Sequence, residues 1–218
     1  AALNLNGATR SAERDVLGRL LTFGTEDSGE QWEYDGSGNV ISALNSPDRS
    51  YNSAWQPVEI DGNGLEHDED GRLIRHGETA YEYVPLGRLV SVGHGGEVTR
   101  FEYDAINQRV RRTQGDRIEE YLWFGGQLLA VYDGTGDRIA LIEHSTAVPN
   151  LVRLYMDETS RLLLPDQVGT PLFELSEGHA TTLSGYSAWG EAPENPEPFA
   201  RWLGYTGAVS DPDLGLVH

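Results

Sequence analysis

The sequence predicts an all-β fold built as a meander of hairpins. Two observations predict it: a recurring turn motif, and an alternation of apolar and polar residues on either side of that motif. The 218 residues include 26 glycines, which tight turns use often and helix interiors tolerate poorly. No stretch carries sustained helical periodicity, although residues 12–22 could form one short helix.

The recurring motif reads Tyr-Asp-x-x-Gly-x and is followed one or two residues later by an aliphatic side chain. Asp opens a turn by accepting a hydrogen bond from the backbone two residues on, and Gly, or Asn, supplies the positive φ that closes it. The copies predict hairpin turns at 35–38, 68–71, 84–87, 104–107 and 133–136, with a degenerate copy around Asp15. The motif residues are Tyr34, Asp35, Gly38, His67, Asp68, Gly71, Tyr83, Gly87, Tyr103, Asp104, Tyr132, Asp133 and Gly136.

The flanks of these turns alternate as strands do, so that Thr99, Phe101 and Tyr103 share one face of their predicted strand. The four tyrosines of the motif are predicted to occupy equivalent places just before their turns and to be largely buried. A large ring with a polar tip suits a sheet face on which the hydroxyl finds a backbone partner. The spacing between copies is irregular, which favours a meander with outer loops of variable length over a strict solenoid.

The composition excludes several classes of function. The formal net charge of −19 argues against nucleic acid or an anionic membrane as partner, because both would repel the surface. All basic residues are arginines and there is no cysteine, which removes lysine Schiff bases, the P-loop lysine, thiolate nucleophiles and disulfides. No apolar run approaches the length that spans a bilayer. The histidines lack ligand spacing, so neither metal nor cofactor is predicted.

The character of the chain changes at about Asn150. Residues 163–171 place a turn cluster between apolar runs, and the proline-rich residues 191–198 are predicted to form an exposed loop. We therefore divide the chain into a repeat region, 1–149, and a second region, 150–218.

The ordered series of motifs resembles a known family. The Tyr-Asp units are similar to YD repeats, although Val84 stands where Asp is expected. The second region is similar to the Rhs-associated core, with Gln167 where His is common, and it stops short at the C-terminal end of that core. The residues that match core motifs are Asp166, Gly169, Thr170, Pro171, Trp189, Gly190, Gly204, Gly207, Asp211, Gly215 and Leu216.

The family contains Rhs polymorphic toxins, the C component of bacterial toxin complexes and the more distant teneurins. The resemblance implies a secreted or cell-surface bacterial protein whose repeats form part of a spiral β-sheet shell around a C-terminal toxin domain. The partners it implies are the rest of the shell polypeptide, a toxin cargo, and other toxin-complex or secretion-system components. The family core normally continues past Leu216, so we expect His218 not to be a native end.

Two other functions stay open beside this non-catalytic shell role. One is a cell-surface adhesion or glycan-binding YD-repeat module. The other is part of an aspartate autoprotease, whose catalytic motif in the family lies downstream of the Asp211 motif.

Two groups of side chains have competing interpretations. Arg109, Arg111, Arg112 and Arg117 form a basic cluster, which we interpret as a solvated hairpin face paired with nearby glutamates. Aromatic residues such as Tyr121 and Trp123 would stack sugars if they faced a groove, but sheet packing is the favoured interpretation.

Overall fold

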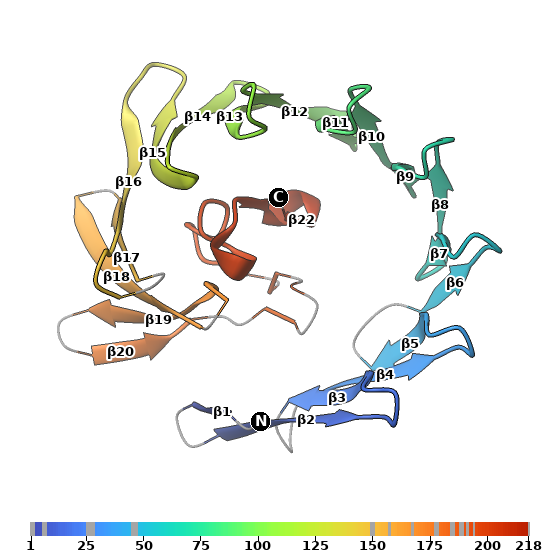
Figure 1. Cartoon of the computed structure of the whole chain (residues 1–218). Coiled ribbons are helices and arrows are strands. Elements are labelled where there is room, and N and C mark those ends of the chain that lie inside the picture. The colour runs from blue at the N-terminus through green and yellow to red at the C-terminus, as the bar shows by residue number, and fades with distance from the viewer. Residues whose placement is uncertain are drawn as a thin grey trace. The chain divides into compact units, whose positions relative to one another are not determined.

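The computed structural model describes residues 3–5, 8–24, 29–44, 48–148, 151–156, 158–166, 168–176, 179–183, 186–187, 190, 192–193 and 195–217. The chain divides into two compact units, Ala1–Glu82 and Tyr83–His218. Both consist of antiparallel strands in chain order, and the helical structure among the described residues is two short 3₁₀ turns (Figure 1). The predicted all-β meander is confirmed. The boundary that the motifs predict, between residues 149 and 150, differs from this one and stays a prediction.

The first unit is a succession of hairpins. Strands β1–β5 form a five-stranded sheet in which each strand pairs with the next, and β6–β9 also pair in chain order. The expected helix at 12–22 is wrong, because the Asp15 turn divides those residues between two strands. The strands are β1 (Leu3–Leu5), β2 (Ala8–Arg14), β3 (Leu20–Gly24), β4 (Gly29–Tyr34), β5 (Val40–Leu44), β6 (Arg49–Tyr51), β7 (Pro57–Ile60), β8 (Asn63–His67), β9 (Leu73–His76) and β10 (Thr79–Tyr83), which reaches the unit boundary.

The second unit continues the same pattern through β20 and then adds a short, mostly irregular C-terminal segment. Its elements are β11 (Leu89–His94), β12 (Glu97–Tyr103), β13 (Arg109–Gln114), β14 (Arg117–Phe124), β15 (Gln127–Asp133), β16 (Arg138–His144), β17 (Val152–Met156), β18 (Thr159–Pro165), β19 (Pro171–Ser176), β20 (His179–Thr182), η1 (Tyr205–Gly207), β21 (Ser210–Asp211), η2 (Pro212–Leu214) and β22 (Leu216–Val217).

The Tyr-Asp turns form at every predicted place, and the turn at Asp35 illustrates their geometry. The Asp35 carboxylate accepts hydrogen bonds from the backbone N–H groups of Ser37 and Asn39, both at 2.9 Å. Gly38, with φ 95°, donates its N–H to the Asp35 carbonyl at 3.1 Å. The strand register shifts between Glu33 and Tyr34. This is a turn closed by a left-handed residue and a bulge, a combination that strengthens the strand twist.

The same geometry also occurs at two places that the motif search did not identify. At Asn52 an amide oxygen replaces the carboxylate, and Trp55 takes the left-handed position with φ 64°. At Asp166 the carboxylate accepts from the N–H groups of Val168 and Thr170, and Gly169 has φ 101°. The core motif that begins at Asp166 is therefore a YD-type turn without the tyrosine.

The opposite ends of several strands are joined by two-residue turns with positive φ at one or both positions. Gly95 and Gly96 have φ 57° and 86°, and Gly125 and Gly126 have φ 59° and 82°. Such turns match the right-handed twist of hairpin strands and require residues that tolerate positive φ. Glycine doublets between strands were available as a sequence signal for them.

The motif tyrosines precede their turns, and all four are more than half buried, as predicted. The Tyr34 hydroxyl donates to the Leu20 carbonyl at 2.6 Å, and the Tyr103 hydroxyl donates to the Leu89 carbonyl at 2.9 Å. The guanidinium group of Arg19 lies over the Tyr34 ring, with its Cζ 4.6 Å from the ring centre. The Arg19 side chain covers the Tyr34 ring only in part, so some of the ring stays exposed.

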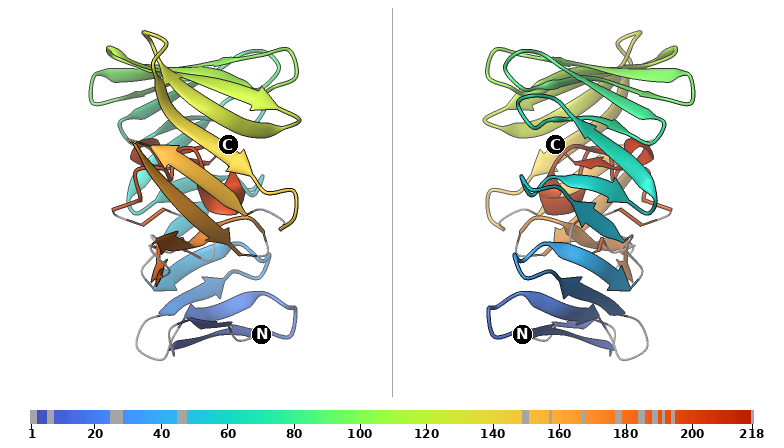
Figure 2. Two further views of the ribbon diagram at one scale, coloured as in Figure 1. Left: turned by 90° about the vertical axis from the view of Figure 1, so that its left-hand side faces the viewer. Right: turned by 90° about the vertical axis from the view of Figure 1, so that its right-hand side faces the viewer.

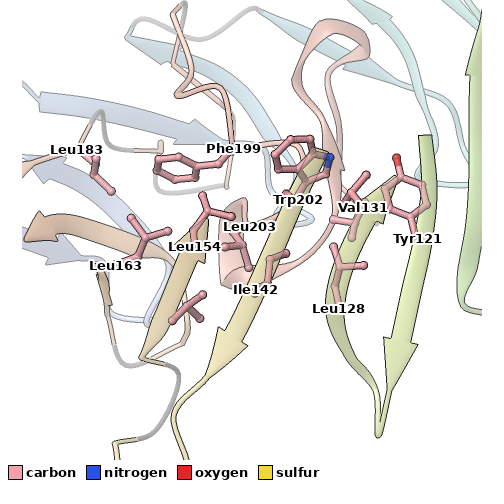
Figure 3. Packing of buried hydrophobic residues seen from close by; sticks show 13 residues of the cluster. Tyr121, Leu128, Val131, Ile142, Leu154, Leu163, Leu183, Phe199, Trp202 and Leu203 are labelled. Atoms are coloured by element: carbon pink, nitrogen blue, oxygen red, sulfur yellow. The ribbon is translucent and has the colours of Figure 1, made fainter. Parts of the chain in front are cut away.

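The apolar core lies in the second unit. Side chains from strands β14–β18 pack against Phe199, Trp202, Leu203 and Val209 of the segment after β20 (Figure 3). This segment lies on one face of the strands, beside β15–β18 in Figure 1 and behind β17 and β18 in the left view of Figure 2. It supplies the second layer that a sheet needs to bury one of its faces.

Candidate functional site

The site is the contact between the sheet of the second unit and residues 195–217, here called the docked segment. Tight turns shape this segment. The Leu203 N–H donates to the Phe199 carbonyl at 3.0 Å, which turns Phe199, Trp202 and Leu203 toward the sheet. The Ser210 N–H donates to the Arg201 carbonyl at 2.9 Å and brings the end of the segment back beside its start. The predicted loop at 191–198 contains no strand among its described residues.

Two glycines of the core motifs are fixed by close packing. A Cβ at Gly204 would lie 2.6 Å from the Ser210 hydroxyl and 2.8 Å from the Ala200 carbonyl oxygen. A Cβ at Gly190 would lie 2.6 Å from the Tyr205 ring. Any larger side chain would force these neighbours to move, so glycine is required at both positions.

The remaining core-motif residues form the turns and contacts of the same region. Gly207 and Gly215 have φ 73° and 66°, and Leu216 pairs with Asp211 in the β21–β22 ladder. Buried Thr170 accepts a hydrogen bond from the Thr206 N–H at 3.0 Å, which joins the Asp166 turn to the docked segment. Trp189 lies outside the described residues.

A buried ion cluster holds the end of the docked segment. Asp211 is 1% exposed and lies between two arginines of β13. Its Oδ1 accepts from Arg112 Nε at 2.7 Å, and its Oδ2 lies 2.8 Å from Arg109 Nη1. Arg112 also donates from Nη2 to Asp213 at 2.6 Å. The interpretation of Arg109 and Arg112 as a solvated face is wrong, because a β-bulge between Arg109 and Arg111 brings both side chains onto the face that the docked segment covers.

A second polar cluster lies on the neighbouring strand. Glu119 of β14 is 5% exposed and accepts from Arg201 Nη1 at 2.6 Å and from the Tyr121 hydroxyl at 2.8 Å. Burial raises the pKa of Tyr121, and the Glu119 carboxylate adds to the shift. Burial lowers the pKa of Arg201, but Glu119 outweighs it and the net shift is upward. By contrast, Arg111 pairs with Glu120 at the exposed surface, as the sequence indicated.

The two clusters hold the docked segment to the sheet through buried ion pairs. Removing one partner from a buried ion pair leaves an uncompensated charge, so we expect a register of the docked segment that breaks these pairs to be less stable. Sequence reasoning missed the cluster because Arg112 and Asp211 lie 99 positions apart. Simple alternation along β13 would place Arg109 and Arg112 on opposite faces, and the bulge that brings them together leaves no mark in the sequence.

Metal sites and membrane-spanning helices were also sought among the residues that the structure describes. No group of three or more His, Asp or Glu side chains there is placed to hold a metal ion. None of the helices there is long and apolar enough to cross a membrane.

The chain is similar to several proteins of known identity. It is 26% identical over 223 residues to teneurin-3 of Danio rerio, covering 94% of this chain and 8% of the relative. It is 19% identical over 203 residues to the tRNA3(Ser)-specific nuclease WapA of Bacillus spizizenii, covering 86% and 9%. The chain thus spans less than a tenth of the length of these relatives.

Among solved structures, the chain is similar to part of the Tc holotoxin pore of Photorhabdus luminescens, with 14% identity, a TM-score of 0.48, and coverage of 83% of this chain and 14% of that one. It is also similar to part of a TcdB2-TccC3-Cdc42 complex, with 14% identity, a TM-score of 0.43, and coverage of 84% and 13%. The model of the teneurin YD-shell family matches residues 4–218, so the chain belongs to the teneurin YD-shell family.

Proposed function

We propose that this chain is a non-catalytic part of an Rhs/YD-repeat shell that encloses a C-terminal toxin domain and helps to deliver it. Membership of the YD-shell family supports a structural, shell-like role. The single observation that carries the proposal is the docked segment, which covers one face of the sheet with an apolar cluster and buried ion pairs. In this role the segment anchors the end of the repeat sheet and limits access along the covered face.

The partners follow from this role. They are the rest of the parent shell polypeptide, a toxin cargo, and components of a toxin complex or secretion system, and the protein acts outside the cell that makes it. The net charge of −19 suits a surface that repels other acidic macromolecules and stays soluble. Catalysis is not part of the role, because Asp211 is engaged by two guanidinium groups rather than aimed at a substrate.

The test uses the longest natural polypeptide that contains this chain. Limited proteolysis followed by mass spectrometry would identify which parts resist cleavage while the repeats are folded. We expect a protected segment outside the YD repeats, and we expect Asp211→Asn to expose it by loosening the docked segment. The matched control is Glu120→Gln, which removes an exposed partner of Arg111.

The result decides between the candidates. A cargo that is cut equally fast in the native protein and in Asp211→Asn, with the repeats intact, would contradict enclosure. Turnover of glycoside, ester or nucleic-acid substrates that one point substitution abolishes would contradict the non-catalytic role.

A further inference from the structure

The connections between the strands of the second unit lie in two rows, one at each end of the strands. In an antiparallel meander the chain reverses at alternate ends, so every second connection belongs to the same row. The first row contains the connections after β10, β12, β14, β16 and β18, and the second contains those after β11, β13, β15, β17 and β19. The left view of Figure 2 shows the strands of this unit with connections at both of their ends.

A large apolar side chain is exposed in every connection of the first row. The exposed fractions range from 48% at Val148 to 82% at Leu86, and the other three residues are Ile106, Phe124 and Val168. The described residues of the second row expose no such side chain. The turns do not require apolar groups, because Asp70 occupies the same place after Asp68 that Ile106 occupies after Asp104. A continuous row of exposed apolar groups, here called the apolar rim, indicates a contact surface.

The apolar rim is compact enough for one partner to contact several of its side chains. Neighbouring strands lie about 4.7–4.9 Å apart, so successive turns of one row are about 10 Å apart and five of them span about 40 Å. A cavity of about 520 Å³ adjoins the rim, and its lining includes Trp123, Asn107, Gly126 and Gln127. The last three are exposed, so the cavity meets the surface at this row. Phe124 therefore projects beside a hollow.

Charge also separates the two rows. The carboxylates of the first row belong to Asp104 and Asp166, which are half-buried and accept hydrogen bonds from the backbone of their own turns. The exposed residues that are described in this row are all uncharged. The second row, by contrast, exposes Glu97, Asp116 and Asp137. An uncharged surface of this length is notable in a chain with a net charge of −19.

This distribution of charge makes a second copy of the chain the partner that the apolar rim fits. Two identical acidic chains repel each other wherever they place carboxylates opposite one another, as the second row would. The apolar rim instead brings apolar and amide groups together, and burial of its apolar surface is favourable. A two-fold contact between identical chains uses the same patch on both, so a projecting side chain must lie beside the hollow that receives its counterpart. Phe124 and the cavity meet this condition.

We propose that the chain associates with a second copy through the apolar rim, about a two-fold axis, with Phe124 of each copy lying against the cavity of the other. The proposal does not rest on toxin enclosure, since association of the purified chain is measured without any cargo. Either proposal can fail while the other holds.

The first test is analytical ultracentrifugation of the complete chain over a concentration series. We expect the mean mass to rise from one copy toward two, and the association to strengthen as salt screens the repulsion between two acidic chains. A mass of one copy throughout the series would overturn the proposal and leave the apolar rim to a different polypeptide. Association that salt weakens would also contradict it, because opposite charges would then make the contact.

Substitutions then locate the contact. Ile106→Asp copies the residue that Asp70 supplies in its own turn, so the strands should form, as far-UV circular dichroism would verify. The added carboxylate should weaken association by about tenfold or more, and Phe124→Ser should weaken it several-fold. The matched control is Val98→Asp, which changes an exposed apolar residue near the second row and should leave association unchanged. Unchanged association in both rim variants, or an equal loss in the control, would contradict the assigned surface.

Spin labels provide a readout that does not depend on stability. The chain has no cysteine, so one introduced cysteine reports on one position. Labels on Gln127→Cys, beside the apolar rim, should give a short distance between the two copies in pulsed electron paramagnetic resonance. Labels on Asp116→Cys, at the other end of the strands, should be much farther apart. A distance at Asp116→Cys equal to or shorter than that at Gln127→Cys would place the contact on the second row and overturn the proposal.

Discussion

The two units are built from the same hairpin repeat, yet they bury their side chains very differently. In the first unit Trp32 is the one buried apolar side chain among the residues whose exposure is described. The second unit buries an apolar cluster that runs from Tyr121 on β14 to Val209 in the docked segment. The repeat therefore specifies strands and turns locally, whereas burial depends on a second layer that the repeat does not encode.

The strongest way to test this difference is to break the buried ion cluster. Asp211→Asn leaves Arg109 and Arg112 without their shared carboxylate, and loss of one partner from a buried pair costs about 3–5 kcal/mol. Hydrogen exchange should show β13 and the docked segment losing protection while β2–β5 stay unchanged. Glu120→Gln, at an exposed pair, should cost less than about 1 kcal/mol. An equal loss in both variants would mean that burial of the cluster does not matter.

The apolar contact of the docked segment should matter nearly as much. Trp202 is 4% exposed, and truncation of a buried tryptophan costs about 3–5 kcal/mol. Trp202→Ala should therefore lower the denaturant midpoint of the second unit. Trp55→Ala in the first unit removes a ring that is 59% exposed. Loss of that ring should change the free energy of unfolding of the first unit by less than about 0.5 kcal/mol.

The contrast between the units also explains what the sequence could predict. The turns at Asp35 and Asp133 were predictable because a short motif contains all of their chemistry. The turn at Asn52 was missed because Trp55 occupies the place where the motif has glycine, and Asp166 was assigned to the core rather than to a repeat. The Arg112–Asp211 pair was beyond local reasoning, since its partners are brought together by packing and not by spacing.

Loss of a tyrosine hydroxyl should destabilise both units by a similar, smaller amount. The hydroxyls of Tyr34 and Tyr103 donate to backbone carbonyls 14 residues earlier in the chain. Removal of one such bond costs about 0.5–1.5 kcal/mol, so Tyr34→Phe and Tyr103→Phe should be equally mild when measured by chemical denaturation. A cost several-fold larger in the second unit would show that the docked segment also stabilises its tyrosine bonds.

The turn carboxylates should make both units sensitive to acid. The Asn39 side chain and backbone N–H groups lower the pKa of Asp35, and the Thr135 hydroxyl with backbone N–H groups lowers the pKa of Asp133. A carboxyl whose folded pKa is depressed stabilises the fold above its unfolded value of about 3.9, and this stability is lost as the pH falls through the folded pKa.

Asparagine provides a matched test of that pH dependence. The Asn52 turn has the same hydrogen bonds with an uncharged amide oxygen, so Asp35→Asn and Asp133→Asn should keep their turns. Each variant should show a flatter dependence of its unit's denaturant midpoint between about pH 5 and pH 2. A midpoint that depends on pH as steeply in both variants as in the natural chain would assign the acid sensitivity to other groups.

The smallest expected effect concerns backbone strain at one position of the first unit. Trp55 has φ 64° in the place that glycine takes in most of the other turns, and its ring is 59% exposed. A left-handed conformation costs an L-residue about 1–2 kcal/mol, whereas glycine adds about 0.5–1 kcal/mol of backbone entropy to the unfolded chain. Trp55→Gly should thus stabilise the first unit by about 0.5 kcal/mol, and Trp55→Ala, which stays strained, should not. Midpoints that rank Ala above Gly would mean that the left-handed conformation costs less than the entropy of glycine, and midpoints of both variants well below that of the natural chain would mean that the indole itself stabilises the turn.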